Sequence, residues 1–465
     1  MPLHTILERS RQWQRQMTVP QFGLIAGGLL ITIGTLVMVT PFCSKDTVGV
    51  WEAFFTVTSA VTVTGLSIIN ISDDLTPLGQ GILASLILTG GLGLMVIINF
   101  LQNFVQKGSG LRDRLDKGRA LDEFGVGGIG PAFYQILITA AFLITLGTLL
   151  LYSFGFTDIS NRGERLWASL FHCISAYNNA GFSLWADNLI RYRCNAVVNL
   201  VIGVLIICGG IGWRVTSDLW ANRSRLSIKR LSLHTRIVLF TTLIYVIFGG
   251  LGFLLAEMHN PRSIISDLDN KEQILVAMFQ SVTTRTAGFS TIPLSQDLLS
   301  DPTLFLMMFM MFVGASPGGT GGGIKTTTFM ILMSATYSTL KGQKDVVVFG
   351  RQLSDKILLK AIGVTVSSLL FVLLMAFILT FEVSYQSNVS NPDHISFLEK
   401  LFTCISAFGT VGLDIGVTSK LSPLGQSVLM FSMFVGRLGI LLSLNVLMTS
   451  QQQSRIAYPR EEIYV

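Results

Sequence analysis

Charged residues are scarce in this sequence. Only 13% of its 465 residues are Asp, Glu, Lys or Arg, whereas an average soluble domain carries about 25%. Half of the residues are hydrophobic, and the mean hydropathy is +0.60. The low charge density excludes an ordinary soluble domain and places the chain in a lipid bilayer. We expect the net charge of +6 to reflect membrane topology, with no nucleic-acid partner.

Cysteine and histidine are too few and too scattered to build a metal site. The five cysteines (Cys43, Cys173, Cys194, Cys208 and Cys404) form no metal-ligand cluster, and inert packing is the expected role of the three inside apolar helices, Cys173, Cys208 and Cys404. Four histidines lack i, i+4 or carboxylate pairing (His172, His234, His259 and His394). Because no nucleophile–base or metal constellation is present, the sequence argues against an enzyme.

Apolar runs of about 20 residues recur along the chain, and each is long enough to cross about 30 Å of hydrocarbon. The first, at 22–39, is longer than the apolar core of a signal peptide and no A-x-A-like site follows it, so we expect it to be retained. We expect eight crossings in four pairs, at about 21–39 and 78–99, 133–156 and 195–219, 237–257 and 304–337, and 357–381 and 424–449.

A shorter amphipathic stretch lies between the two crossings of each pair and ends in a glycine-bearing loop. These stretches cover about 48–60, 164–177, 271–283 and 395–408. They are too short to span a bilayer, and such a helix is tolerated at membrane depth only where protein or water surrounds it. The predicted fold class is an all-α integral membrane protein of four tandem repeats, each a helix, a pore helix and a second helix, with eight transmembrane helices around a pseudo-four-fold pore.

Basic residues concentrate in the segments outside the repeats. These segments hold 21 Lys and Arg and ten acids, and the opposite side holds nine Lys and Arg and 17 acids. By the positive-inside rule, both termini and the loops between repeats are cytoplasmic. The predicted division is a cytoplasmic N-terminal segment (1–20), repeat 1 (21–105), a cytoplasmic loop (106–130), repeat 2 (131–219), a loop (220–236), repeat 3 (237–340), a loop (341–356), repeat 4 (357–449) and a cytoplasmic tail (450–465).

One motif occurs four times along the chain. A phenylalanine lies nine or ten residues before a glycine that Leu or Phe follows (Phe55 and Gly65, Phe171 and Gly181, Phe279 and Gly288, Phe402 and Gly412). Backbone carbonyls can replace the hydration shell of a cation without adding full charges, and glycine permits the backbone angles that point them inward. The repetition therefore indicates one ring of four loops around a cation path.

A glycine-rich segment interrupts the predicted crossing at 304–337. Residues 314–323 contain six glycines and a proline, which cannot continue a helix because each Gly costs about 1 kcal/mol against Ala and Pro about 3 kcal/mol. We expect this crossing to open into a loop at mid-membrane depth. A phosphate-binding P-loop is the competing interpretation, but Ile324 separates Gly323 from Lys325 and no strand precedes the segment.

These motifs resemble those of the Trk/Ktr/HKT superfamily of potassium transporters, and the sequence is most similar to the membrane subunit of Ktr-type systems, from about residue 20 to 450. The similarity lies in Ala60–Leu66, Asn178–Phe182, Thr284–Phe289 and Gly409–Leu413, which resemble the four filter segments of the family. Plant members with serine at the first filter glycine transport sodium, so Gly65 implies potassium selectivity. The resemblance implies a K⁺-channel-like fold whose filter carbonyls hold K⁺ at Thr62, Val63, Thr64, Gly65, Asn178, Asn179, Ala180, Gly181, Arg285, Thr286, Ala287, Gly288, Gly409, Thr410, Val411 and Gly412.

The resemblance further implies that the glycine-rich segment is an intramembrane gate below the filter. We expect Arg437 to donate hydrogen bonds to its carbonyls and to repel a lingering cation. Lys325 either acts at depth or extends to the cytoplasmic face, and Arg285 is expected to brace its loop from behind. The implied gate residues are Gly314, Ser316, Pro317, Gly318, Gly319, Thr320, Gly321, Gly322, Gly323, Lys325 and Arg437.

The resemblance also implies a physiological setting. It is K⁺ uptake across the plasma (inner) membrane by a homodimer with one pore per subunit, with Na⁺ as a possible activator and no covalent cofactor. A cytosolic ring of nucleotide-binding (RCK/KTN-type) regulatory subunits is implied, with docking surfaces near 106–127, 214–236 and 341–356. Membrane lipids with anionic headgroups are alternative partners of the basic loops. The alternative function is a secondary transporter coupled to Na⁺ or H⁺ (a K⁺/Na⁺ or K⁺/H⁺ symporter), for which broken helices are also typical.

Overall fold

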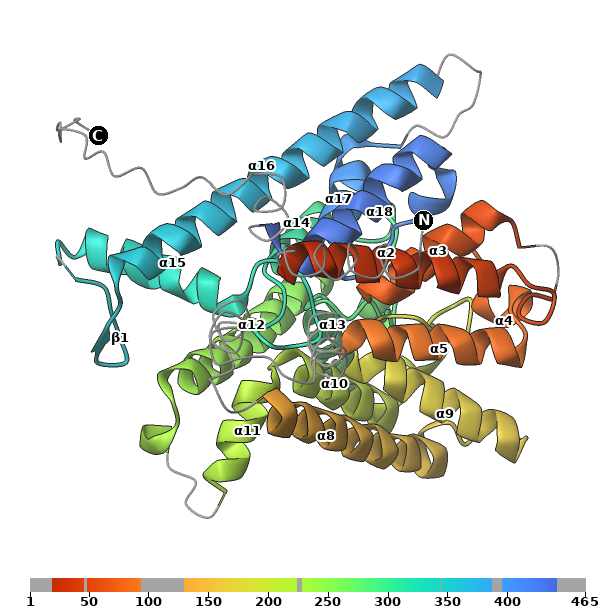
Figure 1. The fold of residues 1–465 in the computed structure, drawn as a ribbon, viewed down its shortest axis with the longest axis horizontal. Helices are drawn as coiled ribbons and strands as arrows, with labels where there is room; N and C mark the ends of the chain where they lie inside the picture. The colour runs from red at the N-terminus through yellow and green to blue at the C-terminus, as the bar shows by residue number, and fades with distance from the viewer. Residues whose placement is uncertain are drawn as a thin grey trace, which may run out of the picture.

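The protein is mostly helical in a computed structural model that describes residues 19–45, 48–92, 129–223, 228–343, 345–386 and 395–440 (Figure 1). Several sequence predictions lie outside these residues. They concern most of the N-terminal segment, most of the loop at 106–130, the end of the second predicted crossing, the end of the last crossing (441–449) and the C-terminal tail.

The helices follow one another in the order expected for repeated units. The first half contains α2 (Val19–Met38), α3 (Val50–Thr62), α4 (Ile71–Asp74), α5 (Pro77–Gly91), α8 (Ile129–Leu150), η1 (Leu151–Gly155), α9 (Arg162–Tyr177), η2 (Ile190–Tyr192), α10 (Ala196–Gly210) and α11 (Trp213–Ala221). The second half contains η3 (Ile228–Arg230), α12 (Leu233–Glu257), η4 (Ile264–Asp267), α13 (Asn270–Thr283), α14 (Asp301–Phe312), α15 (Thr326–Leu340), α16 (Asp355–Gln386), α17 (Phe397–Gly409), η5 (Thr418–Lys420) and α18 (Pro423–Leu438).

The four short amphipathic stretches form α3, α9, α13 and α17, which confirms their predicted positions to within two residues. A glutamate in the first turn fixes two of these starts, and the second forms a complete capping box. Glu52 accepts a hydrogen bond from the backbone amide of Gly49 at 3.0 Å. In α17, Glu399 accepts from the amide of Ser396 at 2.7 Å, and the Ser396 hydroxyl accepts from the amide of Glu399 at 3.2 Å. Acids in the first turn also complement the positive end of the helix dipole.

The C-terminal parts of the short helices are buried inside the molecule, whereas the long helices expose apolar side chains on its outside. The last residues of α3, from Phe55 to Thr62, are all buried, and so are those of α17 from Phe402 to Gly409. By contrast, α8, α12 and α16 expose many large apolar side chains. In Figure 1, α16 runs along the upper side and α8 along the lower side, with α13 between them. Protein therefore encloses the helices that are too short to span, as their depth in a membrane requires.

Three described helices are long and apolar enough to cross a membrane: Tyr134–Gly155, Leu233–Glu257 and Asp355–Phe381. Two shorter apolar helices, Leu24–Met38 and Asp301–Phe312, match parts of predicted crossings. A bent pair, α10 with α11, adds a fourth candidate. The total of eight crossings stays a prediction.

The prediction of one continuous crossing from Asn195 to Leu219 is wrong, because the chain bends by 95° between α10 and α11. The bend occurs at Gly212, which has a φ of +87°. A Cβ at Gly212 would lie 2.6 Å from the carbonyl oxygen of Pro317, so another segment of the chain occupies the space in which a side chain would stand. The apolar run alone does not reveal this contact.

The predicted break in the crossing at 304–337 is observed, since α14 ends at Phe312 and α15 begins at Thr326. A small hairpin departs from the all-α expectation. Strand β1 (Val347–Val348) pairs antiparallel with β2 (Arg351–Gln352) between α15 and α16. Its turn residues, Phe349 and Gly350, have φ values of +48° and +75°, as a tight hairpin turn requires.

Candidate functional site

The short helices α3, α9, α13 and α17 each lead into a loop with the same backbone conformation. The residue two positions before the repeated glycine has a positive φ in every loop: +57° in Val63, +58° in Asn179, +63° in Thr286 and +50° in Thr410. The glycine also has a positive φ: +97° in Gly65, +70° in Gly181, +74° in Gly288 and +89° in Gly412. The left-handed conformation costs about 1–2 kcal/mol for a residue with a side chain. Its occurrence at one position in all four loops indicates that their surroundings impose it.

The four loops contact one another in a closed cycle, which we call the glycine ring (62–65, 178–181, 285–288 and 409–412). A Cβ built on each glycine would meet a backbone carbonyl oxygen of the next loop: Gly65 meets Ala180 at 2.4 Å, Gly181 meets Ala287 at 2.7 Å, Gly288 meets Val411 at 2.3 Å, and Gly412 meets Thr64 at 2.0 Å. The fourth contact returns to the first loop, so the ring closes. A side chain at any of these four positions would face both a strained backbone angle and an approaching carbonyl, which explains the glycine in every loop.

Side-chain hydroxyl and amide groups form hydrogen bonds to residues of the glycine ring. The Ser59 hydroxyl accepts from the amide of Gly65 at 3.0 Å, and the Ser406 hydroxyl accepts from the amide of Gly412 at 3.1 Å. These two serines lie six residues before their glycines, so the first and fourth loops have the same support. The amide group of Asn179 lies 3.3 Å from Oγ1 of Thr286 and links the second loop to the third.

The second helices of three repeats approach the ring closely through glycines. A Cβ on Gly90, Gly209 or Gly436 would lie 2.1, 1.9 or 1.8 Å from the carbonyl oxygen of Val61, Tyr177 or Phe408, respectively. Each of these carbonyls lies four residues before a ring glycine. Glycine at positions 90, 209 and 436 therefore permits the close packing of these second helices against the short helices.

An open cavity of about 430 Å³ lies on one side of the glycine ring. All four ring glycines line it, together with the segments that follow them in the chain. Its polar lining includes Asp187, Asn188 and Asp414. A path through the ring would therefore open into this cavity, and we call it the vestibule.

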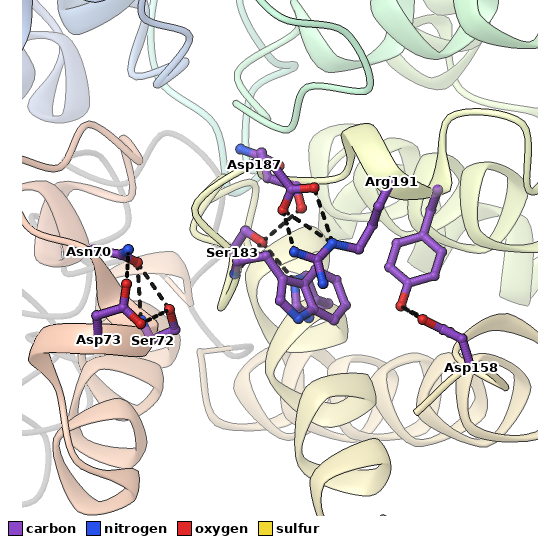
Figure 2. Close-up of polar contacts among 11 residues, drawn as sticks. Asn70, Ser72, Asp73, Asp158, Ser183, Asp187 and Arg191 are labelled. Atoms are coloured by element: carbon purple, nitrogen blue, oxygen red, sulfur yellow. Dashed lines mark hydrogen bonds and ion pairs between the residues drawn. The ribbon is translucent and has the colours of Figure 1, made fainter. Parts of the chain in front are cut away.

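Asp187, which lines the vestibule, forms an ion pair with Arg191, and Figure 2 shows this pair. The Arg191 guanidinium donates to Asp187 at 2.7 Å and stands over the ring of Trp185, 5.1 Å from its centroid. The hydrogen bond and charge of Arg191 hold the pKa of the Asp187 carboxyl below its ordinary value of 3.8. Nearby, the Tyr192 hydroxyl donates to Asp158 at 2.8 Å (Figure 2). The vestibule thus has a carboxylate whose charge a neighbouring cation balances.

The broken crossing forms what we call the intramembrane loop (313–325). It folds back on itself, and the amide of Gly314 donates to the carbonyl of Ile324 at 2.8 Å. The loop also provides hydrogen-bond donors for the last carbonyl groups of α10, which have no partner within the helix. The amide of Ser316 donates to the carbonyl of Gly210 at 3.0 Å, and the amide of Thr320 donates to the carbonyl of Gly209 at 3.1 Å. The loop is therefore tied to α10 by its backbone.

The intramembrane loop lies directly against the glycine ring. The amide of Gly322 donates to Oγ1 of Thr410 at 2.9 Å. A Cβ on Gly321 would lie 1.9 Å from Oγ1 of Thr286, so only glycine fits there. The Thr320 hydroxyl donates to the carbonyl of Tyr177 at 3.2 Å, at the end of α9. The loop thus contacts three of the four short-helix and ring segments.

Two basic side chains hold the intramembrane loop. Arg437 donates to the carbonyl oxygen of Thr320, which confirms the expected hydrogen bond to the loop. The same guanidinium donates to the carbonyls of Gly90 and Gly91 in α5, so it joins the loop to the first repeat. Lys325 donates to the carbonyl of Gly321 at 2.9 Å, and its ammonium therefore reaches back into the loop.

Arg285 lies inside the protein and is only 4% exposed. One of its terminal nitrogens lies 3.9 Å from the position that a Cβ would take on Gly210, at the carbonyl end of α10. A cation at this end complements the helix dipole. The expected role of Arg285 as a brace of its loop stays a prediction.

The structure brings the predicted filter residues together in the glycine ring, although not every side chain faces the ring. Asn178 donates to Ile174 in its own helix, and the Cα of Gly409 faces the carbonyl of Met311. Asp187, Arg191 and Asp414 were not predicted. They lie at different distances after their ring glycines, so comparison of the four repeats does not identify them. Their position shortly after a ring glycine was the one sequence feature that could have indicated a place near the ring.

Comparison with known proteins places the chain in a family. The family model TrkH, described as "Cation transport protein", matches residues 25–456. The Ktr system potassium uptake protein B of Bacillus subtilis (strain 168) is 35% identical over 97% of this chain and 98% of its own length. The potassium/sodium uptake protein NtpJ of Enterococcus hirae is 32% identical over 95% of this chain and 96% of its own length.

A solved structure has the same fold. The potassium transporter TrkH from Vibrio parahaemolyticus superposes with a TM-score of 0.70 at 18% identity, covering 93% of this chain and 86% of that one. The resemblance to the Trk/Ktr/HKT superfamily is confirmed. The chain belongs to the TrkH cation-transport family and is an integral membrane transport protein rather than an enzyme.

Proposed function

We propose that the chain is the pore subunit of a Ktr-type potassium uptake system. The glycine ring is its selectivity filter, and dehydrated K⁺ binds to the backbone carbonyls of the four loops. The observation that carries this proposal is the closed cycle of contacts between each ring glycine and a carbonyl of the next loop, with all four glycines lining one vestibule. The printed names of the two relatives, potassium uptake and potassium/sodium uptake proteins, support the choice of cation.

The intramembrane loop is the proposed gate. It lies against the glycine ring and contributes no residue to the lining of the vestibule. The amide of Gly322 is hydrogen-bonded to Thr410, and Gly321 packs against Thr286. A glycine-rich loop has many accessible conformations, so it can leave this position without melting a helix. Arg437 holds it through a single carbonyl, that of Thr320.

The proposed assembly follows the resemblance to Ktr-type systems. It is a homodimer in the plasma membrane, with a four-fold pseudo-symmetric pore of eight helices per chain and both termini in the cytoplasm. A cytosolic nucleotide-binding ring of RCK/KTN type controls the gate, and Na⁺ acts as an activator. The charge distribution supports this orientation, because Lys and Arg are concentrated in the segments outside the repeats.

Uptake by the purified full-length chain in proteoliposomes tests this function. We expect ⁸⁶Rb⁺, as a tracer for K⁺, to enter down its own gradient in preference to ²²Na⁺ and in the absence of any Na⁺ or H⁺ gradient. Flux without a fixed ion stoichiometry would support a pore. Uptake that strictly requires a Na⁺ or H⁺ gradient would instead support the coupled symporter.

A further inference from the structure

Helix α11 is roughly perpendicular to α10, the apolar helix that precedes it. The axes of α10 and α11 differ by 95°, so α11 runs roughly along the membrane plane if α10 runs along the normal. One side of α11 is packed, since Val215 and Leu219 contact Val238 and Leu239 of α12. Figure 1 shows α11 beside the start of α12.

Polar contacts fix α11 in this position. Asp218 accepts from the backbone amide of Ser232 at 2.9 Å, immediately before α12. The Ser217 hydroxyl donates to Gln135 of α8 at 3.3 Å. The helix is therefore attached to two long membrane helices and presents its remaining surface in a defined orientation.

The remaining surface combines an exposed aromatic ring with positive charge. Trp220 is 66% exposed, and the Arg223 guanidinium lies over its ring, 4.3 Å from the centroid. Lys229 and Arg230 in η3 are also exposed. Within the described residues 213–223 and 228–236 there are five Lys and Arg and one acid, Asp218, which is engaged by Ser232.

We propose that α11 and η3 form a binding site for the headgroup of an anionic phospholipid in the cytoplasmic leaflet. Arg223, Lys229 and Arg230 supply the charge that a lipid phosphate requires, and each basic residue near an anionic surface strengthens binding by about five-fold. A largely exposed Trp on an amphipathic helix in the membrane plane is typical of anchoring at the lipid–water interface. A site for a small soluble anion would not need this ring. The choice of leaflet depends on the orientation in the proposed function.

The site is connected to the intramembrane loop. Gly212, immediately before α11, packs against the carbonyl of Pro317, and the amide of Trp213 donates to the carbonyl of Gly318 at 3.3 Å. A lipid headgroup that holds α11 at the lipid–water interface therefore stabilises the helix to whose start the intramembrane loop is hydrogen-bonded. Lipid composition would act on the loop through α11.

Native mass spectrometry of the full chain in detergent tests the site without requiring transport. The protein is titrated with phosphatidylglycerol and, separately, with phosphatidylcholine. The test variant carries Arg223→Gln, Lys229→Gln and Arg230→Gln. The matched control carries Lys341→Gln, Arg351→Gln and Lys356→Gln, which removes the same charge from exposed residues around the β1–β2 hairpin.

We expect the wild type and the control to retain phosphatidylglycerol in preference to phosphatidylcholine, and the test variant to lose about 100-fold in apparent affinity for phosphatidylglycerol, the product of three five-fold steps. Equal retention by the test variant, or equal loss in the control, would overturn the proposal. Displacement of phosphatidylglycerol by inorganic phosphate would assign the site to a soluble anion and would also overturn it.

Rubidium uptake by the same variants separates this inference from the proposed function. In phosphatidylcholine vesicles the test variant is expected to take up ⁸⁶Rb⁺ at the wild-type rate, which also shows that it is folded. A wild type that binds phosphatidylglycerol but does not transport contradicts only the proposed function. Normal transport combined with no lipid preference contradicts only the lipid site.

Discussion

The backbone amide of Gly322 donates a hydrogen bond to Oγ1 of Thr410 at 2.9 Å, and this bond joins the intramembrane loop to the glycine ring. Thr410 is itself in the left-handed conformation that recurs in all four loops, with a φ of +50°. The proposed gate and the proposed filter therefore share a residue. Movement of the loop away from the ring has to break this bond.

Replacing Thr410 with Val is expected to favour the displaced loop. The change keeps the shape of the side chain but leaves the amide of Gly322 without its acceptor, and an unpaired buried amide costs about 1–3 kcal/mol. A cost of about 1 kcal/mol shifts the equilibrium between the bound and the displaced loop by about five-fold. Uptake of ⁸⁶Rb⁺ in proteoliposomes should therefore rise at least several-fold.

Thr403→Val is the matched control for this change. Thr403 is a buried residue of α17, the helix that ends immediately before Thr410, and its hydroxyl donates to the Glu399 carbonyl within that helix at 2.9 Å. We expect this variant to transport at the wild-type rate. Equal rates in Thr410→Val and Thr403→Val would contradict a role for the Gly322–Thr410 bond in gating.

Arg437 is expected to act by bridging the loop to α5 rather than by its charge alone. Arg437→Lys keeps the charge but cannot contact Thr320 and the Gly90–Gly91 carbonyls together, because an ammonium lacks the planar fork. We therefore expect Arg437→Lys and Arg437→Met to raise ⁸⁶Rb⁺ uptake by similar factors. If the lysine variant behaves as the wild type while the methionine variant does not, the charge is what matters.

The ion pair at the vestibule is expected to set the local concentration of cations. Arg191→Gln leaves the Asp187 carboxylate unbalanced and should lower the KM for K⁺, whereas Asp187→Asn leaves the arginine and should raise it. Electrostatic focusing gives a change of up to about ten-fold at low ionic strength, which added salt should reduce. Shifts of KM in the same direction for both variants would contradict this assignment.

The pH dependence of uptake follows from the same pair. The pKa of Asp187 is lowered because Arg191 hydrogen-bonds to the carboxylate and attracts it. A depressed pKa means that the pair is fully present above the ordinary value of 3.8 and is lost only as the pH falls through the lower value in the folded protein. Asp187 should therefore stay ionised between about pH 7 and pH 5, and we expect no change of the KM for K⁺ that depends on it in this range. If the KM of the wild type changes between these pH values and the KM of Asp187→Asn does not, the Asp187 carboxylate titrates in this range and the assignment is wrong.

Gly212 is expected to be necessary for the bend between α10 and α11. Gly212→Ala places a methyl group 2.6 Å from the Pro317 carbonyl at a φ of +87°, a strain of about 1–3 kcal/mol. Thermal unfolding in detergent should therefore begin at a lower temperature. Gly203→Ala lies within α10 with open space at its Cβ and should unfold at the wild-type temperature or above it. Equal unfolding temperatures for both variants would mean that the bend does not need this glycine.

The sequence alone was sufficient to predict the parts of the fold that follow from local composition or from the repeated motif. The positions of α3, α9, α13 and α17 follow from the Phe and Gly spacing, and the break after Phe312 follows from the density of glycine. The hydrogen bond from Arg437 to the loop was also anticipated. In each case, a local property of the chain or a resemblance points directly to the feature.

The sequence did not reveal features that exist only because distant segments meet. Val63, Thr286 and Thr410 are β-branched residues that avoid a positive φ in isolation, and the surroundings of the ring impose it. The bend after α10 depends on Pro317, about a hundred residues further along the chain. The approach of α11 to the intramembrane loop could not be found from an apolar run that continues to Leu219.

The central claim is that the glycine ring selects K⁺, and the most direct measurement is the ratio of K⁺ to Na⁺ uptake in Gly65→Ser and Gly416→Ser. Both glycines have a positive φ, of +97° and +86°, but a Cβ meets the Ala180 carbonyl only at Gly65 and meets open space at Gly416. The account predicts that Gly65→Ser lowers the ratio while the protein still inserts, and that Gly416→Ser leaves it at the wild-type value. An unchanged ratio in Gly65→Ser would contradict it.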